Sequence, residues 1–241
     1  MILRAEWTKL HTVRSTAWLA LATVTTTAGL GAAASALTTG GDLAKASLSG
    51  VYCGQAVVVV LAVLAMTNEY ASGLVCTTLA CAPRRTRVLI AKAVTVTATA
   101  AGAGLFGVAG SLVAARVLLR DEGFTATAGP TLRAAAGTVL YLGLIALLSL
   151  GIATVLRHTA PALTTVLGLL YLFPLFGQLI SDERWHARIE RYAPMSAGLA
   201  VQATTNLGDL PVGPWTGLGV LAAYTGAALL LGAALFITRD A

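Results

Sequence analysis

Six long apolar stretches constrain the fold of this chain more than any other feature. A bilayer core about 30 Å thick requires roughly 20 apolar residues for each helical span, and the six stretches have about this length. They predict an all-α polytopic membrane protein with six transmembrane helices. The predicted spans are residues 16–37, 48–67, 88–114, 134–156, 160–180 and 215–238.

The composition supports this class. Of the 241 residues, 57% are apolar and 11% are charged, whereas roughly 25% of the residues of an average soluble domain are charged. The net charge of +6 is typical of a membrane protein that keeps Lys and Arg on its cytoplasmic side, so we expect no nucleic-acid partner. Without an internal repeat or linker, residues 1–241 are predicted to form a single membrane domain. The first stretch is longer than the roughly 7–15 apolar residues of a signal peptide, which favours a retained span.

The sequence lacks the motifs and residue clusters typical of disulfide frameworks, metal sites, catalytic sites and proton relays. Three cysteines and three scattered histidines form neither a disulfide framework nor a metal-ligand cluster, so we expect no metal and no cofactor. The chain has no GxxxxGK[ST] phosphate loop, GxSxG or HExxH, and we expect no enzymatic activity. The predicted spans hold no Asp, Glu or His, the residues that carry proton relays. A sodium site built from carbonyls and hydroxyls stays open. Energy for transport would have to come from a partner.

The basic residues predict the orientation. Residues 84–92 hold four cations beside two spans, and dense positive charge favours the cytoplasmic side. Six spans then place both termini in the cytoplasm. The Ala, Gly, Thr and Arg bias resembles high-GC bacterial sequences, so a bacterial cell membrane is expected.

The segment between the second and third spans predicts a short helix on the inner membrane face. Asn68 suits an N-cap, and Glu69 would lie in the first turn, where the helix dipole favours an anion. Positions 71, 74, 75, 78, 79 and 82 form one helix face. Pro83 cannot continue the helix, and Arg84 and Arg85 would complement its C-terminal end. The alternative is an ordinary connector whose arginines only set topology.

Three further patterns predict local structure. Residues 2–15 form a basic amphipathic pattern containing Trp, which favours a helix in the membrane interface over a disordered tail. Its predicted apolar stripe holds Leu3, Trp7 and Leu10, and its predicted polar side holds Arg4, Glu6, Lys9 and His11. Residues 181–214 are predicted to contain an amphipathic surface helix carrying Trp185, Ile189 and Tyr192. A ladder of small residues in the third span fits a close helix contact, although such ladders also arise by chance in Ala-rich chains: Thr99, Ala103, Gly107, Ser111 and Ala115.

Polar or helix-breaking residues inside the spans mark a candidate translocation path. Gln55 and Gln178 are polar side chains at depth, and Pro174 in "YLFPLFGQ" can expose backbone carbonyls by breaking its helix.

Residues 66–92, "MTNEYASGLVCTTLACAPRRTRVLIAK", resemble the segment between the second and third spans of type-2 ABC transporter permeases. Elements that recur there are Glu69, Tyr70, Gly73, Thr78, Leu79, Pro83, Arg84, Arg85, Val88, Leu89 and Lys92. The opening "RAEWTKLHTVRSTAWL" is similar to that of actinobacterial members. "RYAPMSAGLAV" resembles their last outer loop, with Ala-Pro-Met-Ser where Leu-Pro-Ser-Asn is usual.

The resemblance implies a permease, expected to act in an exporter, that pairs with a second permease half and with two cytoplasmic ATPase subunits. It implies that the first inner loop is a coupling helix seated in the ATPase. The residues assigned to coupling are Asn68, Glu69, Gly73, Thr78, Leu79, Pro83, Arg84 and Arg85. A substrate would cross between the two halves, facing the second and fifth spans. The alternative is a membrane-embedded lipid-modifying enzyme or a non-transporting sensor.

Overall fold

The computed structural model describes residues 2–38, 42–74, 85–118, 128–179 and 183–238, and all regular elements in these ranges are helices. Six of its helical segments are long and apolar enough to cross a membrane, so the predicted six-span, all-α architecture is confirmed. The spans are α2 (Arg14–Leu37), α3 with α4 (Leu43–Leu48 and Val51–Ala71), α6 (Arg85–Leu118), α7 (Ala128–Leu156), α8 with α9 (Thr159–Leu167 and Phe173–Leu179) and α12 (Pro214–Thr238).

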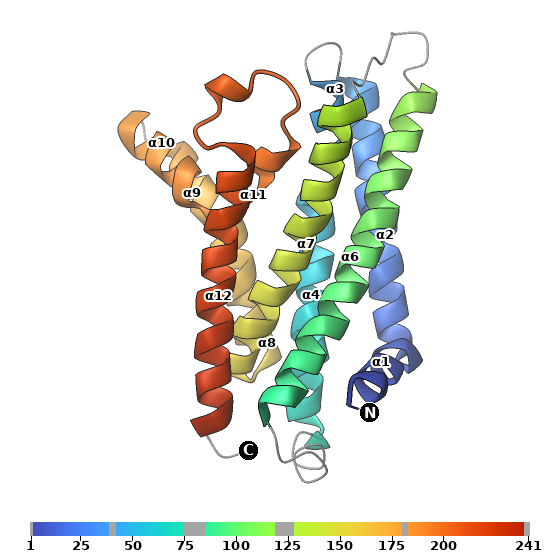
Figure 1. Cartoon of the computed structure of the whole chain (residues 1–241), viewed down its shortest axis with the longest axis vertical. Coiled ribbons are helices and arrows are strands. Elements are labelled where there is room, and N and C mark those ends of the chain that lie inside the picture. The colour runs from blue at the N-terminus through green and yellow to red at the C-terminus, as the bar shows by residue number, and fades with distance from the viewer. Residues whose placement is uncertain (1, 39–41, 75–84, 119–127, 180–182, 239–241) are drawn as a thin grey trace.

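Three shorter helices lie at the ends of the bundle (Figure 1). Helix α1 (Ile2–Thr12) lies across the end where both termini are found, as expected for the N-terminal helix. Helices α10 (Glu183–Tyr192) and α11 (Pro194–Leu199) belong to the opposite end. The helix predicted within residues 181–214 is therefore present.

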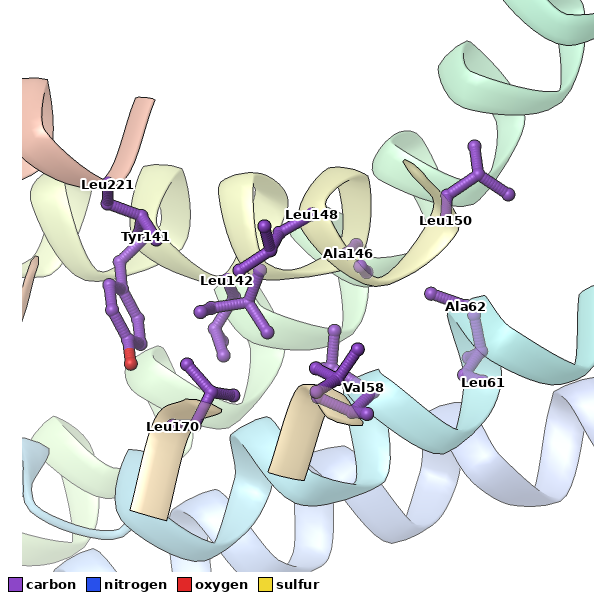
Figure 2. Close-up of a cluster of buried hydrophobic side chains, with 14 of the residues drawn as sticks. Val58, Leu61, Ala62, Tyr141, Leu142, Ala146, Leu148, Leu150, Leu170 and Leu221 are labelled. Atoms are coloured by element: carbon purple, nitrogen blue, oxygen red, sulfur yellow. The ribbon is translucent and has the colours of Figure 1, made fainter. Parts of the chain in front are cut away.

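The core lies between α4 and α7, the two spans with the largest buried share. Leu142 of α7, Val58 of α4 and Leu170 of the fifth span belong to one buried cluster (Figure 2). Lipid tails are as apolar as leucine, so van der Waals packing, rather than removal of apolar surface from water, stabilises this cluster within a bilayer. Helices α4 and α7 thus form the buried centre around which the other spans are arranged.

A second interface joins α2 and α6 through small side chains. The buried residues of α2 recur every fourth position: Thr23, Thr27, Gly31 and Ser35. Opposite them, Ala103, Ser111 and Ala115 of α6 are buried, and a Cβ built on Gly107 would lie 2.9 Å from the Cβ of Thr27. The close contact predicted for the ladder is confirmed along this stretch, because only small residues permit such an approach.

The Asp42 carboxylate connects two segments at the end of the bundle opposite the termini. Asp42 caps α3 by accepting the backbone N–H of Lys45 at 2.9 Å. It also accepts the backbone N–H and the hydroxyl of Thr204, at 2.6 and 2.5 Å, and the backbone N–H of Thr205 at 3.1 Å. Partial burial raises the pKa of Asp42, but these hydrogen bonds outweigh burial and hold the pKa below its ordinary value of 3.8. One side chain thereby joins the start of the second span to the segment before α12.

We expect this contact to make stability depend on pH. A carboxyl group whose pKa is lower in the folded state stabilises that state above its unfolded pKa, and the contribution is lost as pH falls through the folded value. The thermal midpoint of the detergent-solubilised protein should therefore fall on acidification below the ordinary pKa of 3.8. Asp42→Asn should lower the thermal midpoint at neutral pH. It should also reduce the further decrease of the thermal midpoint on acidification. An unchanged pH profile in the Asn variant would contradict the assignment.

Candidate functional site

Four charged side chains meet where α1, α4 and α6 come together, at the end of the bundle that holds both termini. We call Glu6, Lys9, Glu69 and Lys92 the charge cluster. The Lys92 ammonium lies 2.8 Å from a carboxylate oxygen of Glu69 and 3.1 Å from one of Glu6. The Lys9 ammonium lies 2.9 Å from Glu69 and 3.6 Å from Glu6. Two acids and two bases thus alternate in a compact arrangement.

Because the charge cluster is buried, its ion pairs hold α1, α4 and α6 together. Only 3% of Glu6, 4% of Lys92 and 9% of Glu69 is exposed. Lys92 also donates to the carbonyl oxygen of Ala65 at 3.1 Å, so its three N–H donors all have acceptors. Removing an ion from water costs several kcal/mol, which opposite charges and hydrogen bonds must offset. Moving one of the three helices away would leave buried charges without partners.

Lys9 is the partly exposed member of the cluster. Burial lowers the pKa of Lys9, but its hydrogen bond to Glu69 and the negative charges of Glu69 and Glu6 outweigh burial and raise the pKa above 10.5. Lys9 therefore remains positively charged throughout the physiological pH range.

An open pocket of about 280 Å³ adjoins the cluster. All four charges lie on its wall, and the rest is mostly apolar, including Leu10, Leu19, Leu61 and Leu64. A pocket of this kind can receive an amphipathic group, with its apolar part against the leucines and its polar part against the charges.

The structure corrects the position of Asn68 and Glu69. Both residues belong to the last turn of α4, which continues to Ala71, so the prediction that Asn68 caps a new helix and that Glu69 opens it is wrong. The carbonyl of Asn68 instead accepts the backbone N–H of Ser72 at 3.0 Å, as in a continuing helix. The Glu69 carboxylate binds two lysines rather than free backbone N–H groups.

Gly73 ends α4. Its φ of +70° lies in the left-handed region, which glycine adopts without steric cost, and such a residue commonly terminates a helix. A Cβ built at Gly73 would have nothing within 4 Å among the described residues. Within the described part of the chain, glycine is therefore required here for its backbone conformation.

The other residues assigned to coupling are less fully described. Thr78, Leu79, Pro83 and Arg84 lie outside the described residues. Arg85 is the first residue of α6, so it begins the third span, whereas the sequence placed it after a preceding helix.

Gln55 lies in a separate buried polar network in the opposite half of the bundle. Its side-chain oxygen accepts the hydroxyl of Tyr141, and its amide nitrogen lies 3.3 Å from the sulfur of Met195. Met195 also lines a pocket of about 180 Å³ together with Pro174 and Tyr52. Two of the three path candidates thus lie near one another, around Met195. Both polar ends of the Gln55 amide are engaged by the protein.

Pro174 and Gln178 lie in the fifth span. A π-helical segment, Gly168–Leu172, precedes α9, and Pro174 is the second residue of α9. The predicted irregularity at the proline is therefore a widened turn just before it, and the helical conformation continues past it. Single-turn π segments often occur at functional sites. The side chain of Gln178 is outside the described part of the chain.

Sequence reasoning missed Glu6, Lys9 and Lys92 as site residues. Glu6 was assigned to the polar side of the N-terminal helix, but the structure buries it against Lys92. A usable signal was present: Glu69 and Lys92 are opposite charges close to the ends of long apolar helices that are adjacent in the chain. Charges so near hydrocarbon generally pair with one another.

No family model matches the chain, and no curated protein matches it in sequence.

Proposed function

We propose that this protein is the permease subunit of an ABC transporter, acting as an exporter with a second permease subunit and driven by a separate ATPase subunit. The observation that carries the proposal is the charge cluster. It joins α1, α4 and α6 at the two helix ends that flank residues 75–84, the remainder of the segment expected to contact the ATPase. A displacement of that segment would be passed to three helices at once, because their buried charges resist separation.

The distribution of ionisable groups supports an external energy source. Within the described spans, Glu69 is the only acidic residue and no histidine is present. Its carboxylate is occupied by Lys9 and Lys92. A proton-driven transporter needs a series of titratable groups inside the bundle, and a single paired acid near one helix end makes a poor relay.

The same proposal includes location and orientation. We place the protein in the bacterial cell membrane with both termini in the cytoplasm. The support is the density of cations in residues 84–92 together with the positions of the two termini at one end of the bundle (Figure 1).

Co-expression with a candidate ABC ATPase subunit from the source genome tests the function. We expect the ATPase to co-purify with the permease, and the permease alone in lipid to hydrolyse no ATP. Gly73→Val should lower ATPase co-purification and hydrolysis several-fold, because a β-branched residue is strongly disfavoured at the positive φ of Gly73. Gly73→Asn is the matched control, since Asn tolerates this conformation.

Two outcomes would contradict the proposal. One is a wild-type chain that fails to retain the ATPase in lipid. The other is modification of lipids by the purified chain without ATPase, which would favour the enzyme alternative. If the ATPase is retained equally by wild type and by both Gly73 variants, the permease assignment stands and the coupling role of this helix end is wrong.

A further inference from the structure

A second surface of α1 forms a groove with α6, away from the charge cluster. Leu3, Arg4 and Trp7 of α1 and Val94, Thr95 and Ala98 of α6 line a pocket of about 230 Å³, which we call the α1–α6 groove. It shares no lining residue with the pocket beside the charge cluster. Helix α1 thus separates two different sites.

The groove is a fixed feature because α1 is anchored to α6. The Glu6 carboxylate lies 3.1 Å from the Lys92 ammonium, and both side chains are buried. On the other side of α1, Trp7 is 45% exposed and Val94 is 50% exposed. Trp side chains concentrate where a membrane meets water. An open apolar groove near the end of a membrane-spanning helix is suited to lipid.

The charges around the groove have one sign. Among the described lining residues, Arg4 is charged and none is acidic. Arg87 is exposed and precedes Val94 by seven residues on α6, which places it on the same helix face, about 10.5 Å nearer the start of α6. Neither guanidinium is paired with an acid in the described part of the chain. Guanidinium groups bind phosphate oxygens in a bidentate manner.

We propose that the α1–α6 groove binds an anionic phospholipid of the leaflet in which α1 lies. Arg4, assisted by Arg87, binds the headgroup phosphate, and one acyl chain lies along Val94 and Ala98. Arg4 in the lining, Arg87 on the same face of α6 and the absence of an acid among the described lining residues favour an anionic over a zwitterionic headgroup. Basic residues at the cytoplasmic surface attract anionic lipids. This inference does not depend on the transport function.

Quenching of tryptophan fluorescence by brominated lipid tests the site. A protein that retains only Trp7 (Trp18→Phe, Trp185→Phe, Trp215→Phe) is reconstituted in phosphatidylcholine vesicles containing a minor fraction of brominated phosphatidylglycerol or brominated phosphatidylcholine. We expect phosphatidylglycerol to quench Trp7 several-fold more effectively. Arg4→Gln with Arg87→Gln should abolish this preference, since each cation near the membrane surface changes the local affinity for anionic lipid by about fivefold. Arg116→Gln, at the far end of α6, should preserve it.

Two further variants distinguish a specific lipid site from a general attraction of the protein surface for anionic lipid. A protein that retains only Trp18, which is 69% exposed on α2, should show no such preference for phosphatidylglycerol. Ala98→Phe, at an exposed position, should fill the groove and weaken quenching of Trp7 with both arginines intact. The proposal is overturned if the two lipids quench Trp7 equally, if Trp18 shows the same preference, or if the double arginine variant retains it.

Discussion

Replacing Lys92 with methionine is expected to destabilise the protein by about 3–5 kcal/mol, because removing one partner of a buried ion pair leaves an uncompensated charge. Lys92 is the only cation within 3.5 Å of Glu6 among the described ion pairs, and both residues are almost completely buried. Methionine has a similar length and fits an apolar surrounding, so the loss reflects charge rather than volume. The free energy of unfolding in mixed micelles, measured by detergent titration, gives the effect.

A matched control and a rescue define this effect further. Lys45→Met, at an exposed position of α3, should change stability by no more than about 0.5 kcal/mol. Adding Glu6→Gln and Glu69→Gln to the Lys92 variant should recover most of the loss, since no buried anion then lacks a partner. If Lys92→Met is as stable as Lys45→Met, water reaches the charge cluster and its helices are not held by the ion pairs.

Gly31→Val is expected to cost about 3 kcal/mol or more, because an added side chain in a tightly packed interface forces the backbone to shift. A Cβ at Gly31 would lie 2.1 Å from the backbone oxygen of Ser47 and 2.2 Å from the hydroxyl oxygen of Ser111. That hydroxyl donates to the same Ser47 oxygen, so three helices meet at this point. The substitution should separate α2 from α3 and α6.

Gly29 provides the control on the same helix. A Cβ at Gly29 would have nothing within 4 Å, so Gly29→Val should leave stability within about 0.5 kcal/mol of wild type. Both variants introduce the same side chain into α2, so their difference isolates packing from helix propensity. Equal thermal midpoints for the two proteins would show that α2 does not approach its neighbours as closely as described.

The end of α4 shows where sequence reasoning went wrong. Asn and an adjacent acid are common at helix starts, but the same residues also occur in a last turn. The decisive signal was Gly73, which favours a helix end immediately before it. Glu69 tolerates a position that the helix dipole disfavours because Lys9 and Lys92 lie against its carboxylate.

The six spans were determined by the sequence alone, because the length of an apolar run and the thickness of a bilayer are local quantities. The small-residue ladder of α6 was also visible in the sequence, but its partner was not, since four-residue spacing specifies a face and no particular neighbour.

Only the tertiary structure decided which charges meet. Glu69 pairs with Lys9, 60 positions away in the chain, and Glu6 pairs with Lys92 through the packing of α1 against α6. Gln55 likewise finds Tyr141 and Met195 on other segments. Such partners depend on how the helices pack. From the sequence one can infer that a buried polar group has a partner, but not which residue that partner is.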